Sequence, residues 1–218
     1  LVGKYVELND SYKSILESLI HAGTENEVKV NVKSIHSEYL DKENINKKLI
    51  DLDGIIVAPG FGQRGLDGKI LAVEYARVNK IPFLGICLGM QMAVIEYARN
   101  VKKIRYANST EISEKCNDPV IVLMTSQKKI INKGGTMRLG AWDCEILKNT
   151  ISNKIYSKKV VSERHRHRFE FNDEYSKKIF DENFIVAGKN PETNLVEIVE
   201  NKDHPWFVGV QFHPEYKS

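Results

Sequence analysis

The sequence has little that would suit a membrane protein, a secreted scaffold or a nucleic-acid surface. No apolar run approaches the roughly 20 residues that span a bilayer, and no signal-peptide pattern opens the chain. Three cysteines, Cys87, Cys116 and Cys144, form neither a CxxC pair nor an even set, so a disulfide framework is excluded and a reducing, cytoplasmic location is indicated. The net charge of +3 comes from 32 basic and 29 acidic residues that are scattered, so we expect no nucleic-acid partner.

What the chain does have is enough apolar material for one domain. With 218 residues, 42% of them hydrophobic, it can bury a sizeable core, and we assign residues 1–218 to a single domain. It begins "LVGKY", without methionine and already inside a strand-like run. This start predicts a domain excised from the C-terminal part of a longer polypeptide.

Strand-like and helix-like segments alternate in the first half and give way to strands in the second. The spacing predicts strands at 28–35, 53–59, 81–87, 119–124, 160–171, 184–189, 195–200 and 206–213, and helices at 11–22, 68–79, 89–100 and 173–183. We therefore expect an α/β fold: an open, mainly parallel sheet flanked by helices, with additional antiparallel strands in the C-terminal half. Sites in such folds lie at the carboxyl ends of strands.

"GICLG" (85–89) lies at such an end, between a strand and a helix. Strand, Gly-x-Cys-x-Gly and helix make a nucleophile elbow, in which glycines relieve the crowding of a tight turn. The helix N-terminus favours a thiolate at Cys87, and the N–H of Leu88 is placed to donate to an oxyanion. A buried core cysteine beside two packing glycines explains this motif alone equally well.

"QFHPE" (211–215) offers the base that a cysteine nucleophile needs. His213 and Glu215 are two positions apart, and side chains two apart on an extended segment point the same way. Pro214 disfavours helix at His213 and should keep the pair extended. Glu215 would then orient the imidazole, whereas alone this histidine would be read as a solvated strand end.

"RHRHR" (164–168) has two histidines on one face of a strand and three arginines on the other. A zinc site lacks a third ligand at suitable spacing, so we expect no metal. A clamp for a phosphate or carboxylate is the more plausible use of the arginines, and a solvated basic strand stays possible.

"APGFGQRG" (58–65) follows a strand, and its glycines allow a close approach of the backbone to a ligand. It lacks the Gly-Lys-Ser/Thr of a P-loop, which argues against nucleotide binding on that ground.

Together, Cys87 in Gly-x-Cys-x-Gly-x-Gln and the downstream His213-Pro214-Glu215 resemble the triad of class I glutamine amidotransferases. Longer stretches are similar to the glutaminase domains of the CTP synthase family, and the similarity runs nearly end to end. These stretches are 3–8, 60–70, 81–101, 107–111, 134–140, 163–172 and 204–218.

The resemblance implies hydrolysis of L-glutamine by Cys87, His213 and Glu215, with the ammonia passed to an amidoligase domain in the same chain that aminates UTP. It implies no cofactor in this domain, ATP and Mg²⁺ only in the missing synthetase domain, and a homotetramer at full length. The substrate-binding residues it implies are Gly60, Leu88, Gly89, Met90, Gln91, Glu111 and Arg168. The chemistry agrees, because Glu111 suits the ammonium of an amino acid and Arg168 its carboxylate.

One departure concerns the oxyanion hole. The family usually has Pro-Gly-Gly-Phe-Gly where this chain has Ala58-Pro59-Gly60-Phe61-Gly62, and proline has no N–H to donate. We expect Gly60 to donate instead, so that activity is retained.

Three alternatives stay open from the sequence. They are a glutaminase serving another acceptor, which "GGTMRLG" (134–140) argues against; a non-catalytic regulatory domain, which only Pro59 supports; and a general cysteine hydrolase or peptidase. For the last, an amino-acid clamp by Glu111 and Arg168 would serve no purpose.

Overall fold

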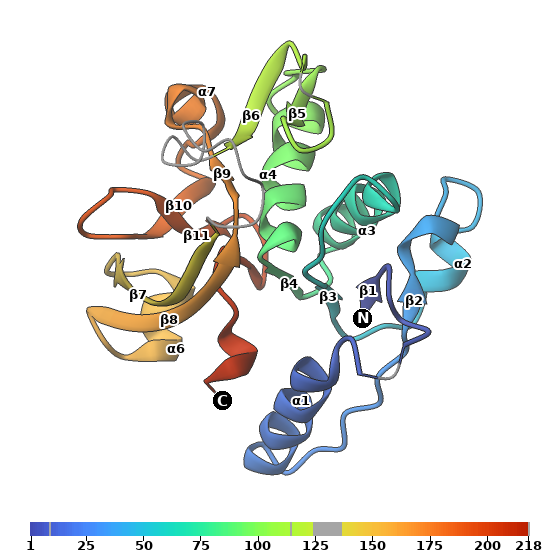
Figure 1. The fold of residues 1–218 in the computed structure, drawn as a ribbon. Coiled ribbons are helices and arrows are strands. Elements are labelled where there is room, and N and C mark those ends of the chain that lie inside the picture. Colours follow the sequence, from blue (N-terminus) through green and yellow to red (C-terminus); the bar gives the residue numbers. More distant parts are fainter. Residues whose placement is uncertain (9, 114, 124–136, 218) are drawn as a thin grey trace.

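The computed structural model describes residues 1–8, 10–113, 115–123 and 137–217, which form a central sheet covered by helices (Figure 1). The first half contains β1 (Val2–Gly3), α1 (Lys13–Glu25), β2 (Ile35–His36), α2 (Ile45–Leu49), β3 (Ile55–Val57), α3 (Leu66–Val78), β4 (Phe83–Ile86), α4 (Leu88–Asn100), β5 (Ala107–Ser109) and β6 (Asp118–Leu123). The second half contains β7 (Arg138–Ile146), α6 (Ile151–Tyr156), β8 (Val160–His167), β9 (Phe169–Phe171), α7 (Ser176–Ile179), β10 (Phe184–Lys189), β11 (Val196–Asn201) and β12 (Phe207–Val210). Short 3₁₀ turns lie at Ser37–Tyr39 (η1), Asp173–Tyr175 (η2) and Pro214–Tyr216 (η3).

The main sheet has the strand order β2-β1-β3-β4-β12-β11-β10-β7-β8. Its pairs are parallel from β2 to β12 and antiparallel from β12 to β8. The three strands β5, β6 and β9 form a second, small sheet. The α/β fold with an open sheet and antiparallel strands in the C-terminal half is confirmed, and the antiparallel part is as extensive as the parallel part.

Helices cover both faces of the parallel half, which is why its strands are apolar throughout. Ile55 and Val57 of β3 belong to the large core beneath α3 and α4. Ile56, which points the other way, packs in a smaller cluster with Ile15 of α1 and with Cys87. The cysteine therefore sits where α1 closes one face of the sheet.

Two predicted elements differ from the structure. Only Ile35–His36 of the segment 28–35 pairs with the sheet, and Val28 and Val30 are exposed, because the alternating segment lies outside the sheet. The predicted helix 173–183 is a 3₁₀ turn and the short α7, since the Asp181 carboxylate accepts the N–H groups of Asn183 and Phe184 and turns the chain into β10.

Boundaries also shift. The first helix runs from Lys13 to Glu25 rather than over 11–22, and the strand predicted at 206–213 ends at Val210. The segment 160–171 divides into β8 and β9 at Arg168. Residues 124 and 134–136, which belong to a predicted strand and a quoted motif, lie outside the described residues.

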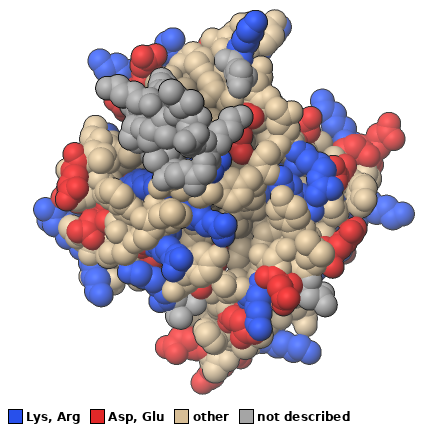
Figure 2. All heavy atoms as spheres, in the orientation of Figure 1, with Lys and Arg blue, Asp and Glu red and all other residues tan. Residues whose placement is uncertain are grey.

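The surface carries both signs of charge. Figure 2 shows Lys and Arg interspersed with Asp and Glu over the face seen in Figure 1. Within the described ranges, none of the helices combines the length and the apolar character needed to cross a membrane.

One buried ion pair joins the two helices behind the elbow. Arg77 of α3 donates to both carboxylate oxygens of Glu96 on α4, with Nη2–Oε1 at 2.7 Å and Nε–Oε2 at 2.9 Å. The Glu96 side chain has no exposed surface. Breaking a buried pair leaves an uncompensated charge, so we expect Arg77→Met to lower the free energy of unfolding by about 3 kcal/mol in urea titrations.

The matched control is Lys159→Ala. Lys159 pairs with Glu145 at 3.0 Å, but its side chain is 76% exposed, so we expect a loss under about 1 kcal/mol. Equal losses for the two variants would show that the Arg77–Glu96 pair does not hold the helices together.

Candidate active site

Cys87 occupies a strained turn between β4 and α4. Its φ of +53° lies in the left-handed region that residues with a side chain seldom adopt. A Cβ on Gly85 would lie 2.7 Å from the Gly89 carbonyl, and one on Gly89 would lie 2.2 Å from the Val57 carbonyl of β3. The flanking glycines thus let the turn fold back on itself and against the next strand, as the elbow interpretation predicted.

The thiol is buried among polar groups. Nε2 of Gln211 donates to Cys87 Sγ at 3.6 Å, and the Arg166 carbonyl lies 4.0 Å from the same sulfur. Leu88 is the first residue of α4, and N–H groups in the first turn of a helix have no partner within the helix. The sulfur therefore lies at the positive end of the helix, beside an N–H that has no partner within the helix.

His213 and Glu215 come together, but not on an extended segment. His213 Nδ1 lies 2.8 Å from Glu215 Oε1, and both side chains are buried. Pro214 begins the 3₁₀ turn η3, for which its fixed φ is suited, and this turn rather than strand alternation brings the carboxylate to the imidazole. The Ser18 hydroxyl of α1 donates to the Ser14 carbonyl at 2.7 Å and lies 3.3 Å from the Glu215 carbonyl, so α1 packs against the turn.

The electrostatics of His213 favour the imidazolium. Burial lowers its pKa, but interactions with Cys87 and Glu215 outweigh burial and raise the pKa to about 10. Its other nitrogen, Nε2, is buried and makes no hydrogen bond within the described residues. A proton on Nε2 is thus available to a group that enters the site.

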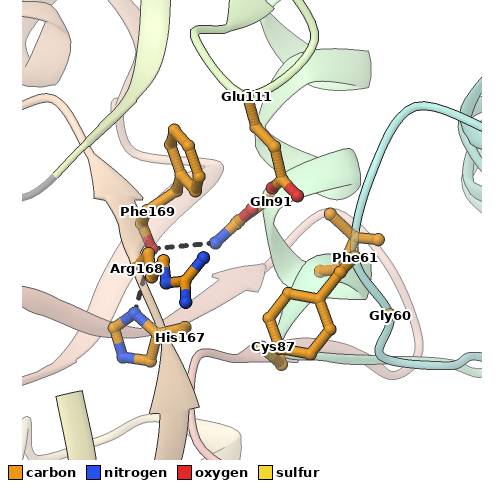
Figure 3. A pocket seen from close by; sticks show the side chains of 9 residues that line it. Gly60, Phe61, Cys87, Gln91, Glu111, His167, Arg168 and Phe169 are labelled. Carbon is orange, nitrogen blue, oxygen red and sulfur yellow. Dashed lines mark hydrogen bonds between the residues drawn. The ribbon is translucent and has the colours of Figure 1, made fainter. Parts of the chain in front are cut away.

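A small pocket opens over the thiol (Figure 3). Nine residues line it: Gly60, Phe61, Cys87, Leu88, Gln91, Glu111, His167, Arg168 and Phe169.

Two predicted ligand contacts, Glu111 and Arg168, face this pocket from different elements (Figure 3). Glu111 follows β5, and its Oε1 accepts the Gly62 N–H at 2.7 Å. Arg168 stands at the break between β8 and β9. The pocket therefore has a carboxylate and a guanidinium to receive an ammonium and a carboxylate.

Gln91 also lines the pocket, one turn after Cys87. Its Nε2 donates to the Phe169 carbonyl at 3.0 Å and to Gln211 Oε1 at 3.1 Å. Its Oε1 is buried and accepts no hydrogen bond in the described part of the chain. An acceptor thus stays open for a donor on a ligand.

Gly89 and Met90 do not line the pocket. Met90 is fully buried in the large core, and Gly89 lets α4 approach Val57. The geometry gives these two residues packing roles, so the implied substrate contacts find no support in their side chains.

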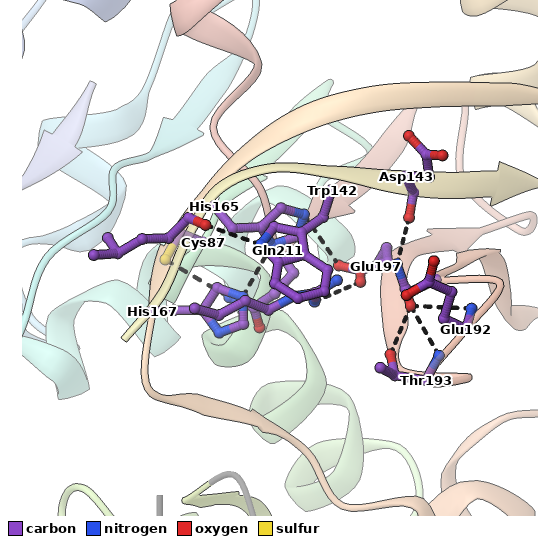
Figure 4. A network of polar contacts seen from close by, with 12 residues as sticks. Cys87, Trp142, Asp143, His165, His167, Glu192, Thr193, Glu197 and Gln211 are labelled. Carbon is purple, nitrogen blue, oxygen red and sulfur yellow. Dashed lines mark hydrogen bonds and ion pairs between the residues drawn. The ribbon is translucent and has the colours of Figure 1, made fainter. Parts of the chain in front are cut away.

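A buried network of polar contacts surrounds His165 and His167, the second of which lines the pocket (Figure 4). His165 Nδ1 and His167 Nε2 are 3.0 Å apart, and His167 Nδ1 donates to the Phe169 carbonyl at 2.9 Å. Burial lowers the pKa of His167 to about 3, so its ring is neutral. Arg138 Nη1 meets Glu197 Oε1 at 2.6 Å within the same network.

This network holds the corner between β8 and β9, so the two histidines have a structural role. The predicted alternation holds, because His165 and His167 are buried while Arg164 and Arg166 are exposed. Arg164 and Arg166 lie over the rings of Tyr216 and Phe61, and only Arg168 enters the pocket. Among the described residues, no three His, Cys, Asp or Glu side chains are grouped to hold a metal ion.

Two residues next to the site were not predicted from the sequence. Gln211 precedes His213 by two positions, so strand alternation alone could have placed it beside the imidazole. Lys69 falls on the inward face of α3, between Leu66 and Val73 in helical spacing. A lysine at such a position is an outlier that periodicity could have detected.

Comparisons with known proteins agree with this geometry. The family described as glutamine amidotransferase class-I matches residues 7–218. CTP synthases from Christiangramia forsetii and Clostridium acetobutylicum are 62% and 59% identical over 218 residues. All of this chain is aligned, and it spans about 40% of the length of these curated relatives.

A solved structure is similar over the whole fold. The glutaminase domain of Trypanosoma brucei CTPS, with bound acivicin, is 39% identical and superimposes with a TM-score of 0.91. The match covers 99% of this chain and 84% of that one. The chain therefore belongs to the class I glutamine amidotransferase family, and within it to the glutaminase domains of the CTP synthase type.

Proposed function

We propose that this domain hydrolyses L-glutamine to glutamate and ammonia through Cys87, His213 and Glu215. The observation that carries the proposal is the pocket itself, in which a thiol at a strained elbow shares one small cavity with Glu111 and Arg168. A peptidase would gain nothing from groups that receive a free ammonium and carboxylate. An amino acid whose side-chain carbonyl reaches the thiol satisfies all three.

Acylation begins when the Cys87 thiolate attacks the Cδ carbonyl of glutamine. The negative charge moves to the carbonyl oxygen, where the N–H groups of Leu88 and Gly60 receive it. His213 gives its Nε2 proton to the amide nitrogen, the C–N bond breaks, and ammonia leaves. The product is a glutamyl thioester on Cys87 and a neutral imidazole.

Deacylation uses the same groups in reverse order. The neutral imidazole of His213 takes a proton from water, which attacks the thioester carbonyl. The C–S bond breaks, glutamate leaves and the thiolate–imidazolium pair is restored. Glu215, at 2.8 Å from Nδ1, holds the ring in one orientation through both steps and stabilises its charged form.

The whole protein would be a CTP synthase. In this proposal the ammonia passes to a synthetase domain of the same polypeptide, outside these 218 residues, which aminates UTP and binds ATP and Mg²⁺. A homotetrameric assembly at full length and a cytoplasmic location belong to the same proposal, and the three free cysteines support a reducing compartment.

The test is CTP formation by the full-length protein with either glutamine or ammonium chloride as nitrogen source. The proposal expects CTP from both, with glutamate formed only from glutamine. Glutamate without CTP from either source would assign the domain to another acceptor. CTP from ammonium chloride alone would support the regulatory alternative and place the defect at Pro59.

A further inference from the structure

Lys69 is the one fully buried lysine in the described part of the chain, and the proposed mechanism does not use it. It lies near the start of α3, directly behind the loop that carries Gly60. Its Nζ donates to the Ala58 carbonyl at 2.5 Å and to the Pro59 carbonyl at 3.4 Å. A Cβ placed on Gly60 would lie 3.6 Å from the same Nζ, so the ammonium group lies against the loop.

These contacts fix the direction of the Gly60 N–H. The Pro59 carbonyl and the Gly60 N–H belong to one planar trans peptide unit and point in opposite directions. Because the Pro59 carbonyl faces Lys69, the Gly60 N–H points away from Lys69, and Gly60 is one of the residues that line the pocket. The N–H makes no hydrogen bond within the described residues, so it is free to donate to a ligand.

The need for such a contact follows from Pro59. Proline offers no N–H, so of positions 59 and 60 only Gly60 can supply a donor. The other side of the loop is held by Glu111, whose carboxylate accepts the Gly62 N–H. In the described ranges, no hydrogen bond on that side holds the peptide between Pro59 and Gly60.

The charge of Lys69 is balanced between its neighbours. Burial lowers its pKa, and so does Lys4, whereas Cys87 and Glu111 raise it; the result is a pKa of about 7. The ammonium form therefore predominates below about pH 7 and is lost as the pH rises through that value. Its positive charge lies against the carbonyls of Ala58 and Pro59.

We propose that Lys69, as an ammonium ion, is a positioning residue that holds the Pro59–Gly60 peptide so that the Gly60 N–H points at the oxyanion. This proposal rests on the glutaminase activity proposed above. It accounts for how a chain with proline at position 59 keeps two N–H donors, from Gly60 and Leu88, around one oxyanion.

The test compares Lys69→Met with wild type in the full-length protein, by glutamate formation. One oxyanion donor is worth about 10²–10³ in kcat, so we expect kcat to fall about 30-fold while KM for glutamine changes less than about threefold. CTP formation from ammonium chloride should be unchanged, because it bypasses the pocket. Lys4→Met is the matched control, since Lys4 also lies against Gly60 but holds no carbonyl of the loop.

Two further readouts separate positioning from folding. The ratio of wild-type to Lys69→Met kcat should fall as the pH rises from about 6 to about 9, because only the wild type loses an ammonium ion over that range. The melting temperature should change by less than about 3 °C, since a buried lysine contributes little net stability.

The modification of Cys87 by acivicin tests the same point without turnover, and we expect Lys69→Met to slow it at least about fivefold. A Lys69→Met kcat equal to that of wild type, a ratio that is flat with pH, or an equal loss in Lys4→Met would overturn the proposal. A wild type that forms no glutamate would overturn the proposed function instead, and the acivicin rate would still decide the role of Lys69.

Discussion

Cys87→Ala is expected to lower glutamate formation from glutamine by about 10⁴-fold or more, because no other group can form the thioester. The thiol is the only nucleophilic side chain of its kind lining the described pocket. The variant should still form CTP from ammonium chloride in the full-length protein. Its melting temperature should be close to that of wild type, because alanine is smaller than cysteine and fits the same site.

The other two cysteines provide the matched controls. Burial raises the pKa of Cys144 well above its ordinary value, and Cys116 lies away from the pocket and is partly exposed. Neither thiol lines the cavity, so Cys116→Ala and Cys144→Ala should keep glutamate formation within about threefold of wild type. An active Cys87→Ala, or an inactive Cys116→Ala, would remove Cys87 from the role assigned to it.

His213→Gln is the second large effect, with an expected loss of about 10⁴-fold in kcat. Glutamine at this position cannot donate a proton to the departing nitrogen or take one from water. The pKa of His213 is raised to about 10, so in wild type the imidazolium is present at neutral pH and is lost only as the pH rises through about 10. Activity should therefore decline on the alkaline side of the pH profile.

Glu215→Gln should change the pH at which activity declines. The Glu215 carboxylate is one of the two interactions that raise the pKa of His213, so its removal should move the alkaline decline to lower pH. The pH profile of kcat/KM for glutamine measures the shift. An alkaline limb that does not move, or that moves to higher pH, would contradict the assignment of Glu215 as the partner of His213.

The elbow and the base could be predicted because each depends on neighbours in sequence. Gly85 and Gly89 are needed by a local turn, and His213 and Glu215 are two residues apart. The 3₁₀ turn at Pro214 was not predicted, because proline is compatible both with the end of a strand and with the first position of a turn. The contact between His213 and Glu215 was predicted, although the backbone between them is a 3₁₀ turn and not the extended segment that was expected.

The parts that were missed depend on strands distant in the sequence. β7 carries Arg138 and pairs with β8 and β10, so the ion pair with Glu197 exists only once the antiparallel half has assembled. The contact between Gln211 and Cys87 joins residues 124 positions apart. No periodicity in the sequence encodes such pairings, whereas the parallel half could be read from alternating strands and helices.

Glu111 and Arg168 could be predicted only in part from the sequence. Their chemistry and the family resemblance suggested an amino-acid clamp, but only the fold brings the end of β5 and the β8–β9 corner to one cavity. The sequence assigned no role to His165 and His167. In the structure they are buried and hydrogen-bonded at the corner between β8 and β9, which gives them a structural role.

The most direct measurement is the mass of the Cys87 peptide after the full-length protein is mixed with glutamine and quenched in acid within one turnover. We predict an added mass of one glutamyl group on Cys87. The adduct should be absent in Cys87→Ala, and it should accumulate in His213→Gln where that variant slows release of the glutamyl group more than its formation. Glutamate formed without any adduct, or an adduct on another residue, would contradict covalent catalysis by Cys87.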